Sequence, residues 1–360
     1  MGKQKTIMLL ITYSCNLHCS YCYEPKTKKF KMTPNYAKRV IKDQVDLLGP
    51  EYDSVEIHFM GGEPLLEYTL IKEVSEWIWG LSWNKKQMVL FAPTNGTLLT
   101  EEMKLWFTSN KDRIQLGLSF DGDMVMQNAN RSMSFTKVDL DYFVKTWHGQ
   151  SVKMTISPQT IGGLSKGVMF LHSRGFKYIT ADLAMGRFVE WTKESLLTFQ
   201  MEIGRLIDFY LENPQLIPVS MLRLNIFALL KENRQPSKTC NCGEDLVCVD
   251  WTGKTYACHL FSPISLPIDK ALIGAQKYDF NNHTQFNDGV CASCLLNKIC
   301  THCYGMNYIC SDDINKPASF HCCAFKLQFV ANCRFALKLA KRDNDIQLEK
   351  NVFQVLQLIK

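Results

Sequence analysis

The sequence predicts an α/β fold in which parallel strands alternate with helices, followed by a small cysteine-rich region. Two observations support this prediction. Six short segments rich in Val, Ile, Leu and Phe are each followed by a longer segment of helical period. The 15 cysteines all lie near the start of the chain or between residues 240 and 333. A chain of 360 residues has room for one barrel-sized domain and a smaller appendage.

The first part of the chain consists of repeated β-then-α units. One helix start is well marked, because Thr33 is a typical N-cap residue and Pro34 suits the first helical position. Units of this size imply parallel strands with right-handed crossovers, as in a doubly wound sheet or a barrel. In both, functional residues lie on loops at the carboxyl ends of the strands. The predicted strands span residues 6–12, 54–60, 87–92, 113–120, 151–157 and 176–183, and further helices lie near 66–79, 100–107, 138–147, 163–173 and 193–211.

The composition excludes several classes of protein. Hydrophobic residues make up 46% and charged residues 21%, which excludes a disordered chain, a collagen and a coiled coil. No apolar run approaches the length of about 18 residues that a membrane span needs. The net charge of +6 is too dispersed to indicate nucleic-acid binding. Without a secretion signal, we expect a cytoplasmic protein whose cysteines bind metal or iron–sulfur clusters.

Three cysteines follow the first predicted strand in one loop, as Cys15, Cys19 and Cys22. Three thiolates can hold three irons of a cuboidal 4Fe–4S cluster and leave the fourth iron open to a substrate. A zinc site completed by His18 or by a distant ligand is the alternative. The loop by itself favours the iron–sulfur interpretation.

Turns with residues suited to ligand binding follow the next three predicted strands as well. The second strand ends in Gly61-Gly62-Glu63-Pro64, where glycines permit close approach of a ligand and the carboxylate suits an ammonium group. The third ends in Thr94-Asn95-Gly96 and the fourth in Ser119-Phe120-Asp121-Gly122. Each is also a common turn sequence. Their occurrence in order, each after its own strand, indicates one functional edge.

In this order the motifs resemble those of the radical S-adenosylmethionine (SAM) enzymes, whose Cys-x3-Cys-x2-Cys motif follows the first strand of a partial (β/α)6 barrel. The resemblance covers residues 6–225 and implies that Cys15, Cys19 and Cys22 bind a 4Fe–4S cluster. One departure is Gln127, which stands where a typical member has histidine. The residues implied in SAM binding are Tyr21, Tyr23, Gly61, Gly62, Glu63, Pro64, Asn95, Ser119, Asp121 and Arg131.

The resemblance also implies the chemistry. The reduced cluster passes one electron to SAM, which cleaves to methionine and a 5′-deoxyadenosyl radical, and this radical removes a hydrogen atom from the substrate. The protein has to hold SAM, exclude water and orient one C–H bond. An external one-electron reductant such as flavodoxin or ferredoxin is then required.

The later cysteines resemble a SPASM domain, which carries two auxiliary 4Fe–4S clusters, although their spacing alone also fits a zinc ribbon. The one departure is a spacing of two residues before Cys303 where three are usual. The resemblance implies domains at 1–225, 226–335 and 336–360, the last a helical tail. It assigns to the first auxiliary cluster Cys242, Cys258 and Cys303, with Cys248 or Cys240 as fourth ligand or an open site. It assigns to the second Cys291, Cys294, Cys300 and Cys322, with Cys323 as the alternative to Cys322.

The residue after Cys258 separates two branches of these enzymes. Anaerobic sulfatase-maturating enzymes, which oxidise Cys or Ser to formylglycine, carry an aspartate there, whereas this chain has His259. Cys-His followed by an aromatic residue resembles the maturases that form thioether or carbon–carbon crosslinks on ribosomally made peptides. We therefore expect a peptide maturase acting on a Cys-containing precursor. His259 would act as a base or as a hydrogen-bonding neighbour of a cluster.

Two further expectations concern partners and alternatives. Because the first predicted strand begins near residue 6, we expect leader recognition to come from a separate protein or from the barrel and SPASM surfaces. An iron–sulfur electron carrier is the non-enzymatic alternative, and the presence of Glu63 and Arg131 argues against it. The sequence leaves open the substrate and the choice between crosslink, aldehyde and epimer.

Overall fold

The computed structural model describes residues 2–24, 30–231, 240–281, 291–301 and 303–358. The chain divides into two compact units, each formed from segments that are distant in the sequence. The first comprises Met1–Ser119, Arg131–Gln150 and Cys240–Asn282. The second comprises Phe120–Asn130, Ser151–Thr239 and His283–Lys360.

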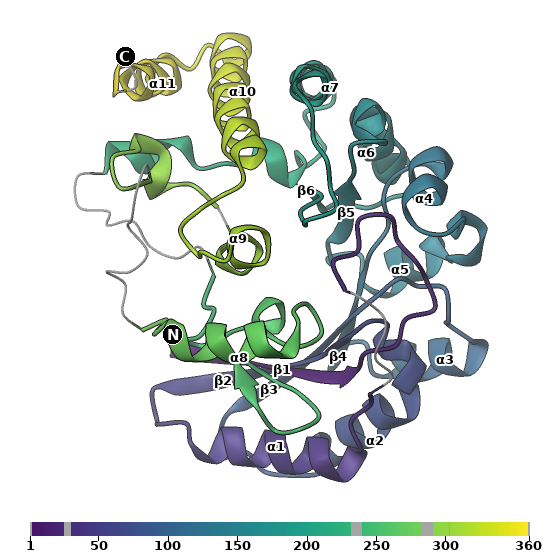
Figure 1. Cartoon of the computed structure of the whole chain (residues 1–360). Coiled ribbons are helices and arrows are strands. Elements are labelled where there is room, and N and C mark those ends of the chain that lie inside the picture. The colour runs from purple at the N-terminus through teal and green to yellow at the C-terminus, as the bar shows by residue number, and fades with distance from the viewer. Residues whose placement is uncertain (1, 25–29, 232–239, 282–290, 302, 359–360) are drawn as a thin grey trace. The chain divides into compact units, whose positions relative to one another are not determined.

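The first unit is built on a six-stranded sheet (Figure 1). Its strands are β1 (Lys3–Thr12), β2 (Tyr52–Gly61), β3 (Gln87–Thr94), β4 (Ile114–Leu118), β7 (Leu246–Val249) and β8 (Thr255–Tyr256). Their order is β4-β3-β2-β1-β7-β8, and every pair is parallel except β7 with β8. The last four residues of β1 are all buried, as expected of a parallel strand covered on both faces.

β7 lies in the sheet beside β1, although it belongs to the cysteine-rich part of the sequence. It pairs in parallel with β1, so that Cys248 lies opposite Met8. The predicted boundary at residue 225 therefore does not separate two sheets. The concentration of cysteines after residue 240 indicates a change in residue types and carries no information on strand pairing. The limits of a cysteine-rich domain remain a prediction.

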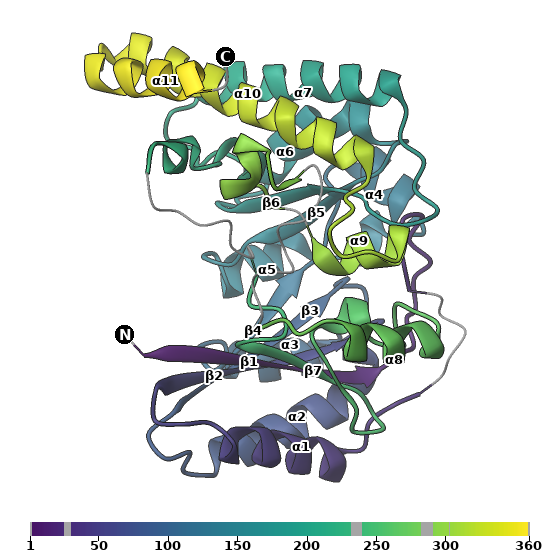
Figure 2. The same cartoon turned by 60° about the vertical axis from the view of Figure 1, so that its left-hand side comes forward.

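The helices of the first unit begin at caps that the sequence indicates. The hydroxyl of Thr33 accepts a hydrogen bond from the backbone N–H of Tyr36 at 3.3 Å and caps α1 (Pro34–Asp46). Thr100 caps α3 (Glu101–Ser109) through the N–H of Met103 at 3.3 Å. α1 lies beside α2 on one face of the sheet (Figures 1 and 2). The other helices of this unit are α2 (Tyr68–Trp79), α5 (Leu140–Thr146) and α8 (Ile268–Lys277).

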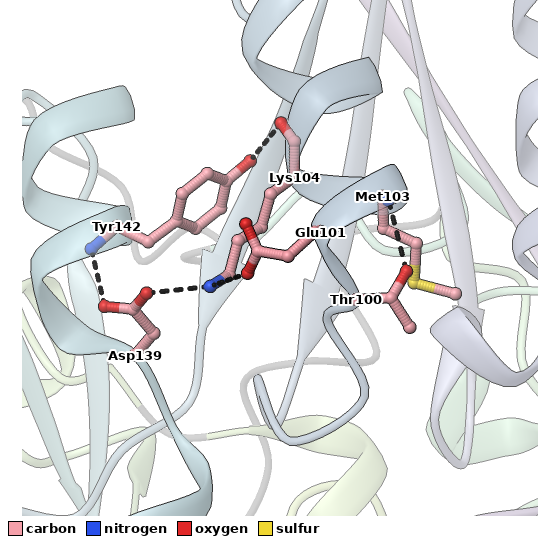
Figure 3. Close-up of polar contacts among 6 residues, drawn as sticks. All are labelled: Thr100, Glu101, Met103, Lys104, Asp139 and Tyr142. Atoms are coloured by element: carbon pink, nitrogen blue, oxygen red, sulfur yellow. Dashed lines mark hydrogen bonds and ion pairs between the residues drawn. The ribbon is translucent and has the colours of Figure 1, made fainter.

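Lys104 joins α3 to the start of α5 (Figure 3). Its ammonium group lies 2.8 Å from Glu101 Oε1 and 2.9 Å from Asp139 Oδ2. The second carboxylate oxygen of Asp139 accepts the N–H of Tyr142 at 3.1 Å and caps α5. The hydrogen bond from Lys104 lowers the pKa of Asp139. One carboxylate thus serves both as an ion-pair partner and as a helix cap.

The second unit contains the other two predicted strands as a parallel pair, β5 (Val152–Ile156) and β6 (Ile179–Leu183). All six predicted strands are present, and the α/β prediction is confirmed. In the described residues the six predicted strands lie in two sheets, β1 to β4 in the first and β5 and β6 in the second. β7 and β8 extend the first sheet. The helices of this unit are α4 (Met124–Asn130), α6 (Leu164–Ser173), α7 (Lys193–Glu212), α9 (Tyr304–Ser311), α10 (Ser319–Asp343) and α11 (Ile346–Leu358).

The C-terminal region is helical, as predicted, but it consists of two helices, of which α10 begins at Ser319, before residue 336. α10 lies against α7 (Figure 2). Asn344 ends α10 with a φ of 53°, the left-handed conformation in which Asn is second only to Gly at helix ends. α10 and α11 share a core that includes Phe329, Val352 and Cys333, a cysteine that the resemblance assigns to no cluster and that is 2% exposed. No helix among the described residues has the length and apolar character to span a membrane.

Candidate active site

The three N-terminal cysteines lie in a single loop directly after β1. Cys15, Cys19 and Cys22 are each partly exposed. The buried Leu17 anchors the loop and donates its backbone N–H to Cys15 Sγ at 3.5 Å. Three thiols in one short, partly exposed loop match the donor set of a cluster that keeps one iron open.

Side chains from the turn after β3 hold this loop. Asn16 donates from Nδ2 to Thr97 Oγ1 at 2.8 Å and accepts from Asn95 Nδ2 at 2.9 Å. Thr97 in turn donates its backbone N–H to Asn95 Oδ1 at 2.9 Å. Sequence reasoning identified Asn95 and missed Asn16 and Thr97. Asn16 is a polar residue within the cysteine loop, and Thr97 is a polar residue directly after Thr94-Asn95-Gly96.

The two glycines after β2 allow close approach, but the group that approaches is the protein's own backbone. A Cβ at Gly61 would lie 2.1 Å from Thr12 O, and one at Gly62 would lie 2.3 Å from Ser14 O. The backbone N–H of Gly62 donates to Thr12 O at 3.2 Å. The glycines therefore bring the end of β2 against the start of the cysteine loop. Pro64 follows as the first residue of a short 3₁₀ helix, Pro64–Glu67.

Glu63 is 1% exposed and is held by three protein donors. Its Oε1 accepts from Leu65 N at 3.1 Å and from Thr94 Oγ1 at 2.8 Å. Its Oε2 accepts from Asn95 N at 2.8 Å. Burial raises the pKa of Glu63, and these hydrogen bonds and the Arg131 charge oppose the rise. The carboxylate fastens the end of β2 to the end of β3 and has little capacity left for another donor.

Arg131 and Ser132 reach the cysteine loop from the segment after α4. The guanidinium of Arg131, which is 7% exposed, lies 5.6 Å from the centre of the Tyr21 ring. The hydroxyl of Ser132 accepts the backbone N–H of His18 at 2.8 Å. The predicted residues Tyr21 and Arg131 are thus neighbours, and Ser132 is an addition that the sequence did not indicate.

Ser119 and Asp121 follow β4. Ser119 donates its backbone N–H to Thr94 O at 2.9 Å within the first unit. Asp121 belongs to the second unit and is 0% exposed. Its Oδ1 accepts from Thr155 N at 2.9 Å and its Oδ2 from Asn130 Nδ2 at 3.2 Å. The Asp121 carboxylate therefore fastens the turn to β5.

Gln127, which stands where a typical member of the family has histidine, has a structural role in its own turn. It is 0% exposed, and its Oε1 accepts the backbone N–H of Asp121 at 2.8 Å. The carboxamide closes the turn between β4 and α4 by satisfying a buried donor.

Tyr23 and His259 are distant in sequence but in direct contact. Tyr23 Oη lies 3.0 Å from His259 Nε2. The Nδ1 atom of His259 is buried and finds no hydrogen-bond partner among the described residues. Burial, followed by the charge of His58, lowers the pKa of His259 to about 4. The imidazole is therefore neutral near pH 7.

In the first unit, four cysteines of the later group lie near one another. Cys242 is in hydrogen-bonding contact with Cys240 and Cys258, and these contacts together with burial raise its pKa. Cys248 is 0% exposed and lies close enough to Cys258 for their charges to interact. Both candidates for the fourth ligand, Cys240 and Cys248, are thus close to the assigned pair.

The remaining assigned cysteines lie in the second unit. The pKa of Cys291 is raised by burial and then by the charges of Cys294 and Cys322. Cys303 begins α9, and Cys323 is exposed on α10. The partnership of Cys303 with cysteines of the first unit remains a prediction. Among the described residues, no three His, Cys, Asp or Glu side chains are gathered around one point as ligands of a single metal ion.

Comparison with known proteins identifies the first part of the chain. Residues 9–138 match the model of the Radical SAM superfamily. This part of the chain is identified as a radical SAM domain. The match includes the cysteine loop and the turns that end β2, β3 and β4, and it confirms the family resemblance drawn from these motifs.

Two curated proteins are similar in sequence. The chain is 24% identical over 269 residues to protein MJ0907 of Methanocaldococcus jannaschii, covering 72% of this chain and 87% of that protein. It is 27% identical over 163 residues to the radical SAM cyclopropyl synthase TigE of Paramaledivibacter caminithermalis. This second match covers 40% of this chain and 32% of TigE.

Solved structures show the same fold. Native anSMEcpe with bound AdoMet superposes with a TM-score of 0.73 at 18% identity, covering 94% of this chain and 99% of that one. Streptococcus suis SuiB bound to its precursor peptide SuiA superposes with a TM-score of 0.58 at 15% identity, covering 89% and 76%. At these identities the similarity establishes the fold.

Proposed function

We propose that this radical SAM enzyme is a peptide maturase that forms a thioether or carbon–carbon crosslink on a ribosomally made, Cys-containing peptide. The observation that carries the proposal is His259, which stands directly after Cys258 where sulfatase-maturating enzymes have aspartate. The fold shared with SuiB, which binds a precursor peptide, supports a peptide substrate. The similarity to the radical SAM cyclopropyl synthase TigE over 163 residues supports radical SAM chemistry.

The cysteine loop fits a 4Fe–4S cluster, and we propose Cys15, Cys19 and Cys22 as its ligands. The partly exposed thiols of one loop supply three ligands, and the Leu17 N–H that donates to Cys15 Sγ would favour the thiolate. When bound, the cluster and SAM supply a 5′-deoxyadenosyl radical by one-electron cleavage of the sulfonium. The remaining work belongs to the chain's own residues.

Those residues hold SAM mainly by fixing the loops around it. We propose that Gly61, Gly62, Glu63 and Pro64 form one wall and that Asn95 and Ser119 form the next. Arg131 supplies a positive charge suited to the SAM carboxylate, and Tyr21 packs under its guanidinium. Asp121 and Tyr23 complete the proposed set.

We propose two auxiliary 4Fe–4S clusters, giving three in all. Cys242, Cys258 and Cys303, with Cys248 or Cys240, would hold the first. Cys291, Cys294, Cys300 and Cys322 or Cys323 would hold the second. A crosslink removes two hydrogens from the peptide: the radical takes one as an atom, and the other leaves as a proton and an electron. An auxiliary cluster held by these cysteines would supply the acceptor for that electron, and an external one-electron reductant such as flavodoxin or ferredoxin would be required.

For His259 the contact with Tyr23 favours a hydrogen-bonding role over that of a base. A neutral imidazole bonded through Nε2 to a phenol orients the Tyr23 side chain, which adjoins Cys22. The proposal also includes a cytoplasmic location, where thiol ligands stay reduced. A separate protein would present the leader of the peptide.

Formation of formylglycine is the second candidate function. It is favoured by the higher TM-score to anSMEcpe, an anaerobic sulfatase maturase, than to SuiB. This reaction also removes a hydrogen atom, a proton and an electron from the side chain of Cys or Ser, and with Cys the oxygen then comes from water and the sulfur leaves as sulfide. It ends in an aldehyde and not in a crosslink.

Anaerobic turnover distinguishes the two. Reconstituted enzyme, a reductant and SAM are incubated with Cys-containing peptides encoded near its gene, and product masses are read after thiol alkylation. A product that is lighter by two hydrogens and has one fewer thiol available for alkylation supports thioether formation. A product that is lighter by two hydrogens and keeps all its thiols supports a carbon–carbon bond. Loss of sulfur with gain of an aldehyde would replace the maturase proposal by formylglycine formation.

A further inference from the structure

The segment after α4 contains two successive residues with left-handed backbone conformations. Ser132 has a φ of 52° and Met133 a φ of 53°. Glycine adopts this region without cost, whereas other residues carry strain in it. Two strained residues in succession indicate that the surrounding structure requires this turn.

The strained turn contacts the cysteine loop at two points. Ser132 Oγ accepts the backbone N–H of His18 with an N···O distance of 2.8 Å. The preceding residue, Arg131, places its guanidinium 5.6 Å from the centre of the Tyr21 ring. Because His18 and Tyr21 flank Cys19 in the sequence, the turn contacts the loop on both sides of this cysteine.

We propose that Ser132 is a positioning residue for the cluster-binding loop, and that its hydroxyl oxygen fixes the peptide plane between Leu17 and His18 and so orients the backbone at Cys19. The inference rests on the proposed function, because it takes Cys19 to be a cluster ligand. A planar peptide whose N–H is held by a fixed acceptor leaves only two soft dihedrals before the next residue. Leu17, which is 3% exposed, holds the other end of the same peptide by packing.

The side chains at the two strained positions differ in what they contribute. Glycine in place of Ser132 relieves strain and removes the acceptor for His18. Glycine in place of Met133 relieves strain at the adjacent residue, and the Met133 side chain is 69% exposed. The two replacements therefore form a matched pair in which the hydrogen bond is the difference.

The test compares Ser132→Gly with Met133→Gly in the full chain, reconstituted anaerobically with iron and sulfide and then reduced with dithionite. The EPR signal that changes on addition of SAM is followed while a chelator removes iron, because a cluster with an open iron gives this response. We expect Ser132→Gly to lose the signal about three to ten times faster than wild type, the scale of one hydrogen bond. Met133→Gly should match wild type, and Ser132→Asn should restore the slow rate, since Asn tolerates this conformation and carries an acceptor.

A second measurement needs no cluster. In the apo protein, amide hydrogen exchange at His18 should be faster in Ser132→Gly than in Met133→Gly. Equal exchange and equal rates of signal loss in these two variants would overturn the inference.

Replacing Cys19 by alanine distinguishes a failure of the proposed cluster ligands from a failure of the role proposed for Ser132. If the SAM-responsive signal survives in Cys19→Ala, the loop does not bind the cluster, and both the proposed ligands and the role of Ser132 are wrong. If that signal disappears while the two glycine variants behave alike, the ligand proposal stands and the role of Ser132 falls.

Discussion

Replacing Glu63 by glutamine should loosen the turn after β2 and weaken SAM binding by a moderate factor. The carboxylate accepts hydrogen bonds from Leu65 N and Thr94 Oγ1 at one oxygen and from Asn95 N at the other. Glutamine offers one oxygen, so its amide nitrogen has to face at least one of these donors.

The structure sets the size of the effect. If the glutamine oxygen takes the Oε1 position, the amide group faces the backbone N–H of Asn95, a residue that is 6% exposed. One buried donor without an acceptor costs about 1–3 kcal/mol. The burial that raises the pKa of Glu63 offsets part of this cost, because a neutral amide is cheaper to bury than a carboxylate. We therefore expect a net loss of about 1–2 kcal/mol, or a fall in melting temperature of about 2–8 °C.

Thermal unfolding of the apo protein, amide hydrogen exchange at Asn95 and SAM titration of the reconstituted protein together measure the effect. Glu73→Gln is the control, because Glu73 is 47% exposed and pairs with Lys38 at the surface. An unchanged melting temperature and unchanged hydrogen exchange at Asn95 in Glu63→Gln would refute the conclusion that Glu63 fastens the end of β2 to the end of β3. A loss of SAM affinity above about a hundredfold, near 3 kcal/mol, with unchanged stability would show that the carboxylate binds SAM directly.

Three further predictions concern contacts in the two units. Asp139→Ala removes the partner of Lys104 and the cap of α5, and should lower the stability of the apo protein by about 1–2 kcal/mol, whereas Asp139→Asn keeps a cap and should lose about half of that. Because the pKa of Asp139 is lowered in the folded state, its contribution is present above the ordinary value of 3.8 and is lost below it. The difference in melting temperature between wild type and Asp139→Asn should therefore shrink from pH 6 to pH 3, and a constant difference would contradict the ion pair. Gln127→Leu leaves the buried N–H of Asp121 without its acceptor and should cost about 1–3 kcal/mol; stability equal to wild type on thermal unfolding would show that the carboxamide is dispensable. Tyr23→Phe removes the partner of His259 Nε2 and should cost about 1–3 kcal/mol, and no change in melting temperature would mean that the contact contributes nothing.

The strands and their order in the first unit follow largely from local pattern. Buried parallel strands have short apolar runs, and strands that are consecutive in the chain are neighbours in most sheets. β7 escaped prediction because its four residues, Leu246–Val249, carry too little pattern to reveal pairing with β1. Pairing between segments more than two hundred residues apart depends on tertiary packing, which periodicity does not encode.

The candidate site was predictable where chemistry depends on residue type and spacing. Cys15, Cys19 and Cys22 were recognised from their spacing alone, which is that of the radical SAM motif, and their role as cluster ligands remains a prediction. Ser132 could not be found in this way, because its role depends on a left-handed backbone and on the position of the His18 amide. Serine is common in turns, so its presence after α4 carried no signal.

The polar residues at the strand ends are bound to one another more tightly than their motifs suggest. Glu63 fastens β2 to β3, and Asp121, held by Thr155 and Asn130, fastens the turn after β4 to β5. The Glu63 carboxylate, whose two oxygens already accept three protein donors, has about one acceptor position left for a cofactor. We propose that these side chains serve SAM by holding the loop backbones in place, with Arg131 as the side chain that carries charge to the ligand. Substitutions at Glu63 and Asp121 should then change stability and SAM affinity together, whereas Arg131→Gln should reduce affinity with a much smaller change in stability.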